Sequence, residues 1–273
     1  MRYRSARWNG KKVDGMSVRS VERAFRVLQE LNLQPVSSIA HLHARTGLAK
    51  STLVRILSTL EQAGYVDNDP RQGGYQVTAL VDSLSSGYHK DPLVVEAGRA
   101  WAVALTRAHQ WPIAIAIFDT DAVVVRFSTV PDSAMSPFHK TVNMRLGLFY
   151  RGLGLAYLAF APDEQIELTI EMLSHSPDAE NELARDPDRL WSLIKRVRKQ
   201  GFAERAAHVE PSNSNTLAVP VFNEQGRVAA SLGLTYFTSA FRNRAEAVDR
   251  YLEGLQTSSR EITSELGRLS LQS

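Results

Sequence analysis

The chain contains no cysteine. Disulfide bonds, thiolate nucleophiles and cysteine metal ligands are therefore excluded. It also has no run of about 18 apolar residues, which a membrane-spanning helix would need. Its basic first residues lack the apolar core of a secretory signal. We therefore expect a cytoplasmic protein that has no membrane partner.

Positive and negative charge are unevenly distributed along the chain. The sequence carries 32 Lys and Arg against 29 Asp and Glu, so its formal net charge is +3. Residues 1–87 hold 12 of the basic and 7 of the acidic residues. The remainder therefore has a slight acidic excess. This asymmetry indicates a polyanion-binding module ahead of a module with another task.

Residues 17–78, which follow a flexible basic tail at 1–16, show the element order of a winged helix-turn-helix domain. Apolar residues recur at helical spacing over 20–31, and a second helix is expected after an N-cap at Ser37. A tight connection at 46–48 leads to a third helix, which ends near Gly64. Two β-prone segments, 65–66 and 75–77, flank a turn-rich stretch and predict a hairpin.

The third helix has two dissimilar faces. Leu53, Ile56, Leu57 and Leu60 are spaced to hold it against the domain core. In a helix-turn-helix, the second helix of the motif lies in the major groove with its N-terminal residues at the base edges. We therefore predict that the start of this helix and the hairpin tip bind DNA through six residues: Lys50, Ser51, Thr52, Arg55, Arg71 and Gln72.

A connecting helix is expected within 79–92, over residues 79–88, and residues 93–273 then mix helices with mostly antiparallel strands. Strands are expected at 113–118 and 122–127, and a hairpin at 216–222 and 227–237. Helices are expected at 93–110, 152–161, 163–173, 187–200 and 245–269. This combination indicates an α+β domain that senses a ligand.

A pocket for an organic acid needs a cation or a cluster of amides among apolar walls. Arg126 ends a strand otherwise made of valines, so it is the first candidate for the carboxylate partner. His139 and Arg151 are further candidates. Four aromatic residues are candidates for the walls: Trp111, Phe138, Phe149 and Tyr236.

No sequence motif indicates an enzyme. His41 and His43 point to different faces of a helix and make poor joint metal ligands. The chain has no H-E-x-x-H, G-x-S-x-G or Walker sequence. The run GLG at 152–154 lacks the third glycine of a dinucleotide site. We predict no catalytic residue and no cofactor, while a zinc site built from His and Asp in the second domain stays open.

The chain resembles a known family over residues 17–269. The runs SVRSVERAFRVLQEL and SSIAHLHARTGLAKSTLVRILSTLEQAGYVDNDPRQGGYQVT are similar to the DNA-binding domain of IclR-type bacterial transcriptional regulators. The runs RGLGLAYLAF, VRKQGFAE and TLAVPVFNEQGRVAASLGLTYF are similar to the effector-binding domain of that family. Within the family, WPIAIAIFDTDAVVVR and RGLGLAYLAFAP resemble activators of phenylpropionate-type aromatic acid catabolism.

The resemblance implies a GAF-like effector-binding domain, dimers or tetramers on DNA, and a small organic acid as the signal. It implies that backbone at the start of a helix meets the ligand carboxylate and that side chains of the late hairpin line the pocket. Carried over by position, the effector site comprises six residues: Gly152, Leu153, Glu210, Thr216, Gly233 and Thr235.

Three positions depart from the family pattern. Gly233 stands where a hydroxyl-bearing or thiol-bearing residue is frequent, and Leu153 is bulkier than the usual small residue. Both departures disfavour a two-carbon acid as ligand. Ala49 stands where a capping side chain is usual, so the recognition helix is expected to lack its side-chain cap.

The sequence therefore predicts an α+β protein in which an N-terminal winged helix-turn-helix is joined by a helix to a GAF-like α/β effector-binding domain. We expect a sequence-specific transcriptional regulator that binds a pseudo-palindromic operator in double-stranded DNA as a homodimer or homotetramer. A small organic acid, aromatic in type, would control it. The alternative is a DNA-binding regulator whose large domain serves only oligomerisation.

Overall fold

The computed structural model describes residues 18–69, 73–85, 92–138 and 141–272. Contacts within the chain divide it into two compact units, Met1–Lys90 and Asp91–Ser273. The tail at residues 1–16, the hairpin tip with Arg71 and Gln72, and His139 lie outside the described residues.

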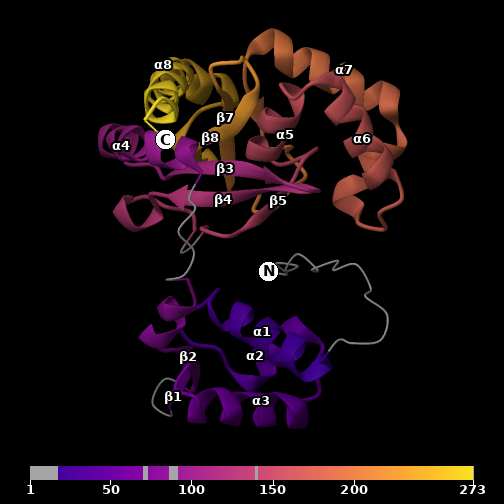
Figure 1. Ribbon diagram of the computed structural model, residues 1–273, viewed down its shortest axis with the longest axis vertical. Coiled ribbons are helices and arrows are strands. Elements are labelled where there is room, and N and C mark those ends of the chain that lie inside the picture. Colours follow the sequence, from indigo (N-terminus) through magenta and orange to yellow (C-terminus); the bar gives the residue numbers. More distant parts are fainter. Residues whose placement is uncertain (1–17, 70–72, 86–91, 139–140, 273) are drawn as a thin grey trace. The chain divides into compact units, whose positions relative to one another are not determined.

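The first unit consists of three helices followed by a two-stranded antiparallel hairpin (Figure 1). Its elements are α1 (Arg19–Leu31), α2 (Ile39–Thr46), α3 (Lys50–Gln62), β1 (Val66–Asp69), β2 (Gly74–Val77) and the 3₁₀ helix η1 (Ala79–Ser85). Its core contains Val27, Leu31, Leu42, Leu53 and Leu57, all of which are fully buried. The order and the core confirm the predicted winged helix-turn-helix.

The cap of α2 differs from the prediction by one residue. The side chain of Ser38, not that of Ser37, accepts the hydrogen bond from the backbone N–H of His41, at 3.2 Å. Ser37 instead exchanges two backbone hydrogen bonds of 2.9 Å with Tyr75 of β2. Because that bridge fixes Ser37 in extended backbone, the helix begins one position later.

Two glycines end helices as expected. Gly47 after α2 has φ +69° and Gly64 after α3 has φ +82°, both in the left-handed region that favours glycine. The left-handed turn at Gly47 sets the angle between α2 and α3.

The helix predicted for residues 79–88 begins where expected but is of the tighter 3₁₀ type. Residues 79–85 form a 3₁₀ helix, and the remainder lies outside the described residues. The side chain of Thr78 accepts from the N–H of Leu80 and donates to the carbonyl of Gly64. These local side-chain bonds satisfy the first turn in a tighter geometry than an α-helix provides.

The second unit is built on a six-stranded antiparallel sheet in the order β5-β4-β3-β8-β7-β6. The strands are β3 (Ile113–Asp119), β4 (Ala122–Ser128), β5 (Arg145–Gly147), β6 (Ala203–Glu204), β7 (Ser214–Phe222) and β8 (Val228–Phe237). The two central hairpins were predicted. β5 and β6 were not, because three and two residues are too short to show an alternating pattern.

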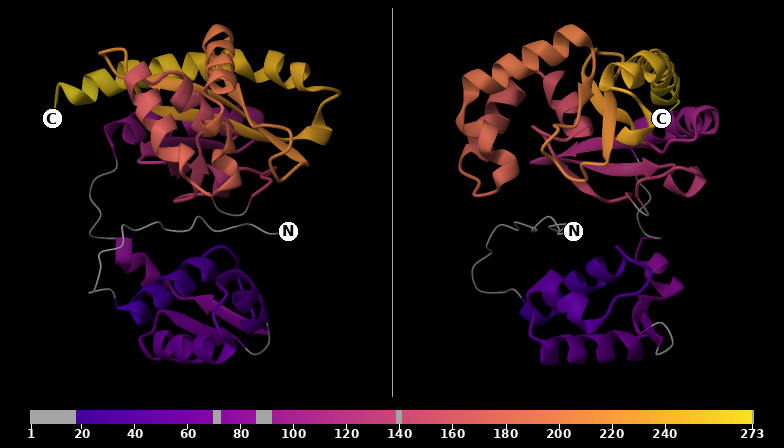
Figure 2. Two further views of the ribbon diagram at one scale, coloured as in Figure 1. Left: turned by 90° about the vertical axis from the view of Figure 1, so that its right-hand side faces the viewer. Right: turned by 180° about the vertical axis from the view of Figure 1, so that it is seen from behind.

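Helices cover both faces of the sheet (Figures 1 and 2). One face packs against α4 (Leu93–His109) and α8 (Arg244–Ser270), and the other against α5 (Gly152–Ala159), α6 (Asp163–Ser174) and α7 (Pro187–Gln200). Side chains of β7 and β8 therefore alternate between two hydrophobic clusters. None of these helices is both long and apolar enough, within the described residues, to cross a bilayer.

Candidate DNA-binding and effector sites

Helix α3 presents a polar surface at its N-terminal end. Lys50, Ser51 and Arg55 are exposed and Thr52 is half-buried, whereas the opposite side of the helix is buried in the core. Ala49 precedes the helix without any side-chain cap, as the sequence indicates. The amides of the first turn and the cation of Lys50 therefore favour an anion at this end.

One residue of this surface was not predicted. Val54 is 47% exposed and lies three positions after Ser51, on the same side of the helix. An exposed apolar side chain between polar ones can contact the methyl group of thymine in the major groove. Its position three residues after Ser51 could have indicated this exposure. From residue type alone, however, an apolar valine is expected in the core.

A buried ion pair holds α1 to α2 behind this surface. The guanidinium Nε of Arg45 donates to Oε2 of Glu30 at 3.0 Å, with the side chains 14% and 2% exposed. Sequence reasoning missed this pair because Glu30 lies in an otherwise apolar stripe of α1, where a charged residue is rare.

The predicted effector residues of β7, β8 and α5 come together on one face of the sheet. Thr216 and Thr235 face each other across the hairpin, and their hydroxyl oxygens are 3.0 Å apart. A methyl group at Gly233 would lie 2.8 Å from Leu153 Cδ2 and 3.3 Å from Thr216 Cγ2. The side chain of Leu153 thus fills the space that a larger residue at Gly233 would take.

The first turn of α5 lies against the threonine pair. A methyl group at Gly152 would lie 2.9 Å from the carbonyl oxygen of Thr216, so the helix and β7 approach more closely than any other residue would allow. The first helical bond runs from the N–H of Leu155 to the carbonyl of Arg151. The amides before Leu155 are therefore free of α-helical bonds and favour an anion.

Arg126 occupies an irregular position in β4. Ile115 pairs with Phe127 and Ala116 pairs with Val125, so Arg126 is the extra residue of a β-bulge. Its guanidinium donates to the side-chain oxygen of Asn143 at 3.4 Å. This hydrogen bond links the bulge of β4 to the segment just before β5.

Arg151 and Glu210 are engaged with other groups. The guanidinium of Arg151 pairs with the carboxylate of Glu180 at 2.5 Å and donates to the carbonyl oxygen of Glu210 at 3.0 Å. The carboxylate of Glu210 accepts from the N–H of Ser212 at 2.8 Å. The charge of Arg151 is therefore largely compensated by Glu180.

The predicted aromatic walls do not share one face of the sheet. Trp111 and Tyr236 belong to the cluster under α4 and α8, where the indole of Trp111 donates to the hydroxyl of Tyr251 at 2.8 Å. Burial raises the pKa of Tyr236, helped by the nearby carboxylate of Glu204. Phe149 belongs to the opposite cluster, on the α5 side. Tyr236 and Thr235 are neighbours in a strand and so point to opposite faces, which excludes Tyr236 from the threonine side.

No group of three His, Asp or Glu side chains in the described part of the chain is arranged to hold a metal ion. The prediction about Arg71, Gln72 and His139 concerns residues outside that part. The first unit therefore exposes the polar start of α3. In the second unit, the start of α5 lies beside Thr216 and Thr235.

A winged helix-turn-helix with an exposed polar recognition helix, joined in one chain to an α/β unit, defines the class of effector-controlled transcription regulators. The model of the IclR helix-turn-helix domain matches residues 20–70, and the model of the bacterial transcriptional regulator IclR C-terminal domain matches residues 93–264. The chain belongs to the IclR family of bacterial transcriptional regulators, a family of DNA-binding proteins and not of enzymes.

Known relatives extend over nearly the whole chain. The HTH-type transcriptional regulator KdgR of Escherichia coli is 24% identical over 92% of this chain and 94% of its own length. The crystal structure of Thermotoga maritima IclR superposes with a TM-score of 0.66 at 18% identity, covering 92% of this chain and all of that one. An IclR homolog from Microbacterium hydrocarbonoxydans, crystallised with 4-hydroxybenzoate, gives a TM-score of 0.62 at 18% identity, with 90% and 98% covered. These similarities show the fold of both units.

Proposed function

We propose that two copies of this regulator bind the half-sites of a pseudo-palindromic operator, each through the start of α3. The observation that carries this proposal is the exposed face of α3, with Lys50, Ser51, Val54 and Arg55 projecting from a helix whose other face is buried. Arg55 offers the planar donor pair that reads guanine, and Val54 offers an apolar contact. The predicted DNA contacts of Arg71 and Gln72, at the tip of the hairpin, remain part of this proposal.

Arg55→Ala is expected to reduce the preference for the operator strongly and leave folding intact, because Arg55 is exposed. Loss of one bidentate base contact costs about 1–3 kcal/mol of discrimination. The measurement is the ratio of affinities for a duplex selected from a random-sequence pool and for a scrambled duplex. Arg196→Ala, an exposed change of equal charge on α7, serves as the matched control. An unchanged ratio for Arg55→Ala would remove α3 from base recognition.

Pairing of two copies on DNA requires a surface for self-association. Along α1 and just before it, Val18, Val21 and Phe25 are 61%, 50% and 54% exposed. These apolar side chains lie at helical spacing on one side of the recognition domain. They support the homodimer as the unit that binds the operator.

For the second unit we propose that an organic acid binds where the start of α5 meets the threonine pair. The free amides around Leu153 would hold the carboxylate, and the hydroxyls of Thr216 and Thr235 would donate to it or to a second polar group. Gly233 leaves room that the side chain of Leu153 fills. Rotation of Leu153 away from Gly233 would open this space for a ring.

An aromatic acid is the proposed effector. Its support is the resemblance of residues 111–126 and 151–162 to activators of aromatic acid catabolism, together with the 4-hydroxybenzoate in the Microbacterium homolog. Binding of the acid would change the spacing of the two DNA-binding units in the dimer. The change would be transmitted through the segment that begins at η1. Such coupling between two sites is typically worth about 1–3 kcal/mol.

Phenylpropionate or a hydroxybenzoate is expected to raise the melting temperature, because a ligand that binds only the native state stabilises it. Glyoxylate and pyruvate are the small-acid comparisons. The shift should diminish in Thr216→Val and in Arg126→Ala, which test the hydroxyl and the predicted cation separately. Thr169→Val is the matched control, since Thr169 is also buried but its hydroxyl donates to Gln165 within α6. Absence of a shift with every acid would favour a second unit that serves only oligomerisation.

A further inference from the structure

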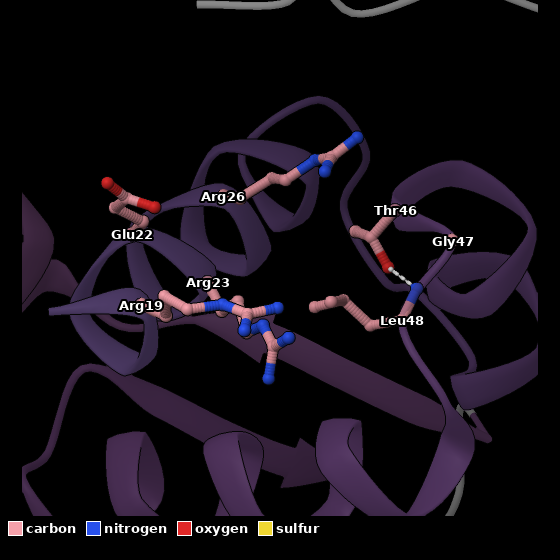
Figure 3. A pocket seen from close by; sticks show the side chains of 7 residues that line it. All are labelled: Arg19, Glu22, Arg23, Arg26, Thr46, Gly47 and Leu48. Atoms are coloured by element: carbon pink, nitrogen blue, oxygen red, sulfur yellow. Dashed lines mark hydrogen bonds between the residues drawn. The ribbon is translucent and has the colours of Figure 1, made fainter. Parts of the chain in front are cut away.

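Three arginines that the recognition surface does not use surround one cleft of the DNA-binding unit. Arg19, Arg23 and Arg26 are spaced four and three residues apart, so they project from one side of α1. With Glu22 they form one wall, and the turn Thr46-Gly47-Leu48 forms the other. Figure 3 shows Arg19 and Arg23 extending from α1 toward Leu48. We call this feature the arginine cleft.

The arginine cleft carries an excess of positive charge, because three guanidinium groups share its wall with the single carboxylate of Glu22. None of its three guanidinium groups lies within 4.0 Å of a carboxylate oxygen of the described residues. Arg151 and Arg198, by contrast, each pair with a carboxylate. Like charges on one side of a helix repel one another and destabilise it. Their arrangement is explained if an anion from outside the chain occupies the cleft.

The far wall of the arginine cleft leads directly into the recognition helix. The N–H of Leu48 donates to the hydroxyl of Thr46 at 3.2 Å, and that hydroxyl donates to the carbonyl of Leu42 at 2.6 Å. These bonds fix the turn, and α3 begins two residues after Leu48. An α3 seated in the major groove would therefore bring this turn to the rim of the groove, where the sugar-phosphate backbone runs.

We propose that the arginine cleft clamps the backbone of the operator through one or two phosphates beside the groove that α3 enters. The planar guanidinium fork matches a phosphate with two parallel hydrogen bonds, which explains arginine at all three positions. A phosphate contact positions the protein on DNA without carrying sequence information. This proposal rests on the proposed function of α3, and it separates positioning by α1 from base recognition by α3.

The test is the salt dependence of DNA affinity for Arg19→Ala/Arg23→Ala, measured on the selected duplex and on the scrambled duplex. The plot of log K against log salt has a negative slope, and each lost phosphate contact reduces its magnitude by about 0.9. The slope should therefore become less steep by about 1–2 for both duplexes. Affinity should weaken about ten-fold on both duplexes at physiological salt. The preference for the selected duplex should stay unchanged, because phosphate contacts carry no sequence information.

The control is Arg189→Ala/Arg196→Ala, which removes the same charge from exposed positions of α7. Arg19→Lys/Arg23→Lys keeps the charge without the fork and should retain the salt slope while losing part of the affinity. A slope and affinity equal to those of the unaltered chain, or a loss equal to that of the α7 control, would overturn the clamp. If the unaltered chain prefers the selected duplex, such a result leaves the function of α3 standing. If it selects no duplex at all, the proposed function itself fails.

Discussion

Gly154→Ala is expected to destabilise the effector-binding unit strongly, because the helix that carries the proposed ligand site cannot approach the sheet as closely with a side chain there. A methyl group at Gly154 would overlap the carbonyl oxygen of Gly147 and lie 2.9 Å from Leu148 Cα. All of these atoms belong to backbone, so no side-chain rotation relieves the overlap. Overpacking of a core typically costs about 1–3 kcal/mol, and a clash with backbone is expected to exceed that range.

The effect can be separated from the general effect of removing a glycine from a helix. Gly254, in α8, has only Leu105 and His109 near its missing Cβ, both at 3.7 Å, which is ordinary contact. Alanine is favoured over glycine inside a helix by about 0.5–1 kcal/mol, so Gly254→Ala should raise the melting temperature slightly. Calorimetry of both variants gives the comparison.

The two units also give separate readouts. Gly154→Ala should lower the melting temperature of the second unit and remove the increase in melting temperature that the ligand causes. Binding of the scrambled duplex should be weakened less, since α3 belongs to the other unit. A Gly154→Ala protein with the melting temperature of the unaltered chain would show that α5 can move away from β5, and our account of this packing would be wrong.

Much of this architecture could be predicted from the sequence, because its signals are local. Alternating or continuous apolar runs indicated the strands at 113–118 and 122–127, and helical spacing indicated α1, α3, α4 and α8. Positive φ at Gly47 and Gly64 follows from their places after helices. The edge strands β5 and β6 escaped, because a strand of two or three residues has no periodicity to read.

The register of the last hairpin could not be read from the sequence. Phe222 pairs with Val228, but Val221 pairs with Ala230, so a bulge shifts the pairing by one residue. Without that bulge Thr216 would oppose Leu234, which points to the other face. Only the shifted register places Thr216 opposite Thr235. The resemblance to a family gave these positions, whereas the alternation of apolar residues along the strands did not.

The candidate cations show a second limit of sequence reasoning. Arg126 and Arg151 are candidates in the sequence as single basic residues near apolar runs, but the partners of a charge come from distant parts of the chain. Arg151 meets Glu180, which is 29 positions away. Whether a cation is available to a ligand therefore depends on tertiary contacts that no local pattern encodes. The same limit hid the ion pair of Glu30 with Arg45.

Glu30→Ala is expected to destabilise the DNA-binding unit by about 3–5 kcal/mol, the usual cost of removing one partner of a buried ion pair. Arg45 would keep its charge at 14% exposure without the carboxylate that compensates it. Small domains are typically stable by only about 0.05–0.15 kcal/mol per residue. The variant should therefore lose affinity for the selected and the scrambled duplex alike, whereas Arg55→Ala loses mainly the preference between them.

A double substitution tests whether charge or packing is responsible. Glu30→Leu/Arg45→Met replaces the pair by apolar side chains, which is often neutral or stabilising at buried sites, so it should restore the thermal transition and DNA affinity. Glu61→Ala, an exposed change on α3, is the control for loss of one carboxylate and should be nearly silent. An ordinary melting temperature for Glu30→Ala would mean that Arg45 turns to solvent when its partner is gone. The contact between α1 and α2 would then rest on the apolar cluster that contains Val27, Leu31 and Leu42.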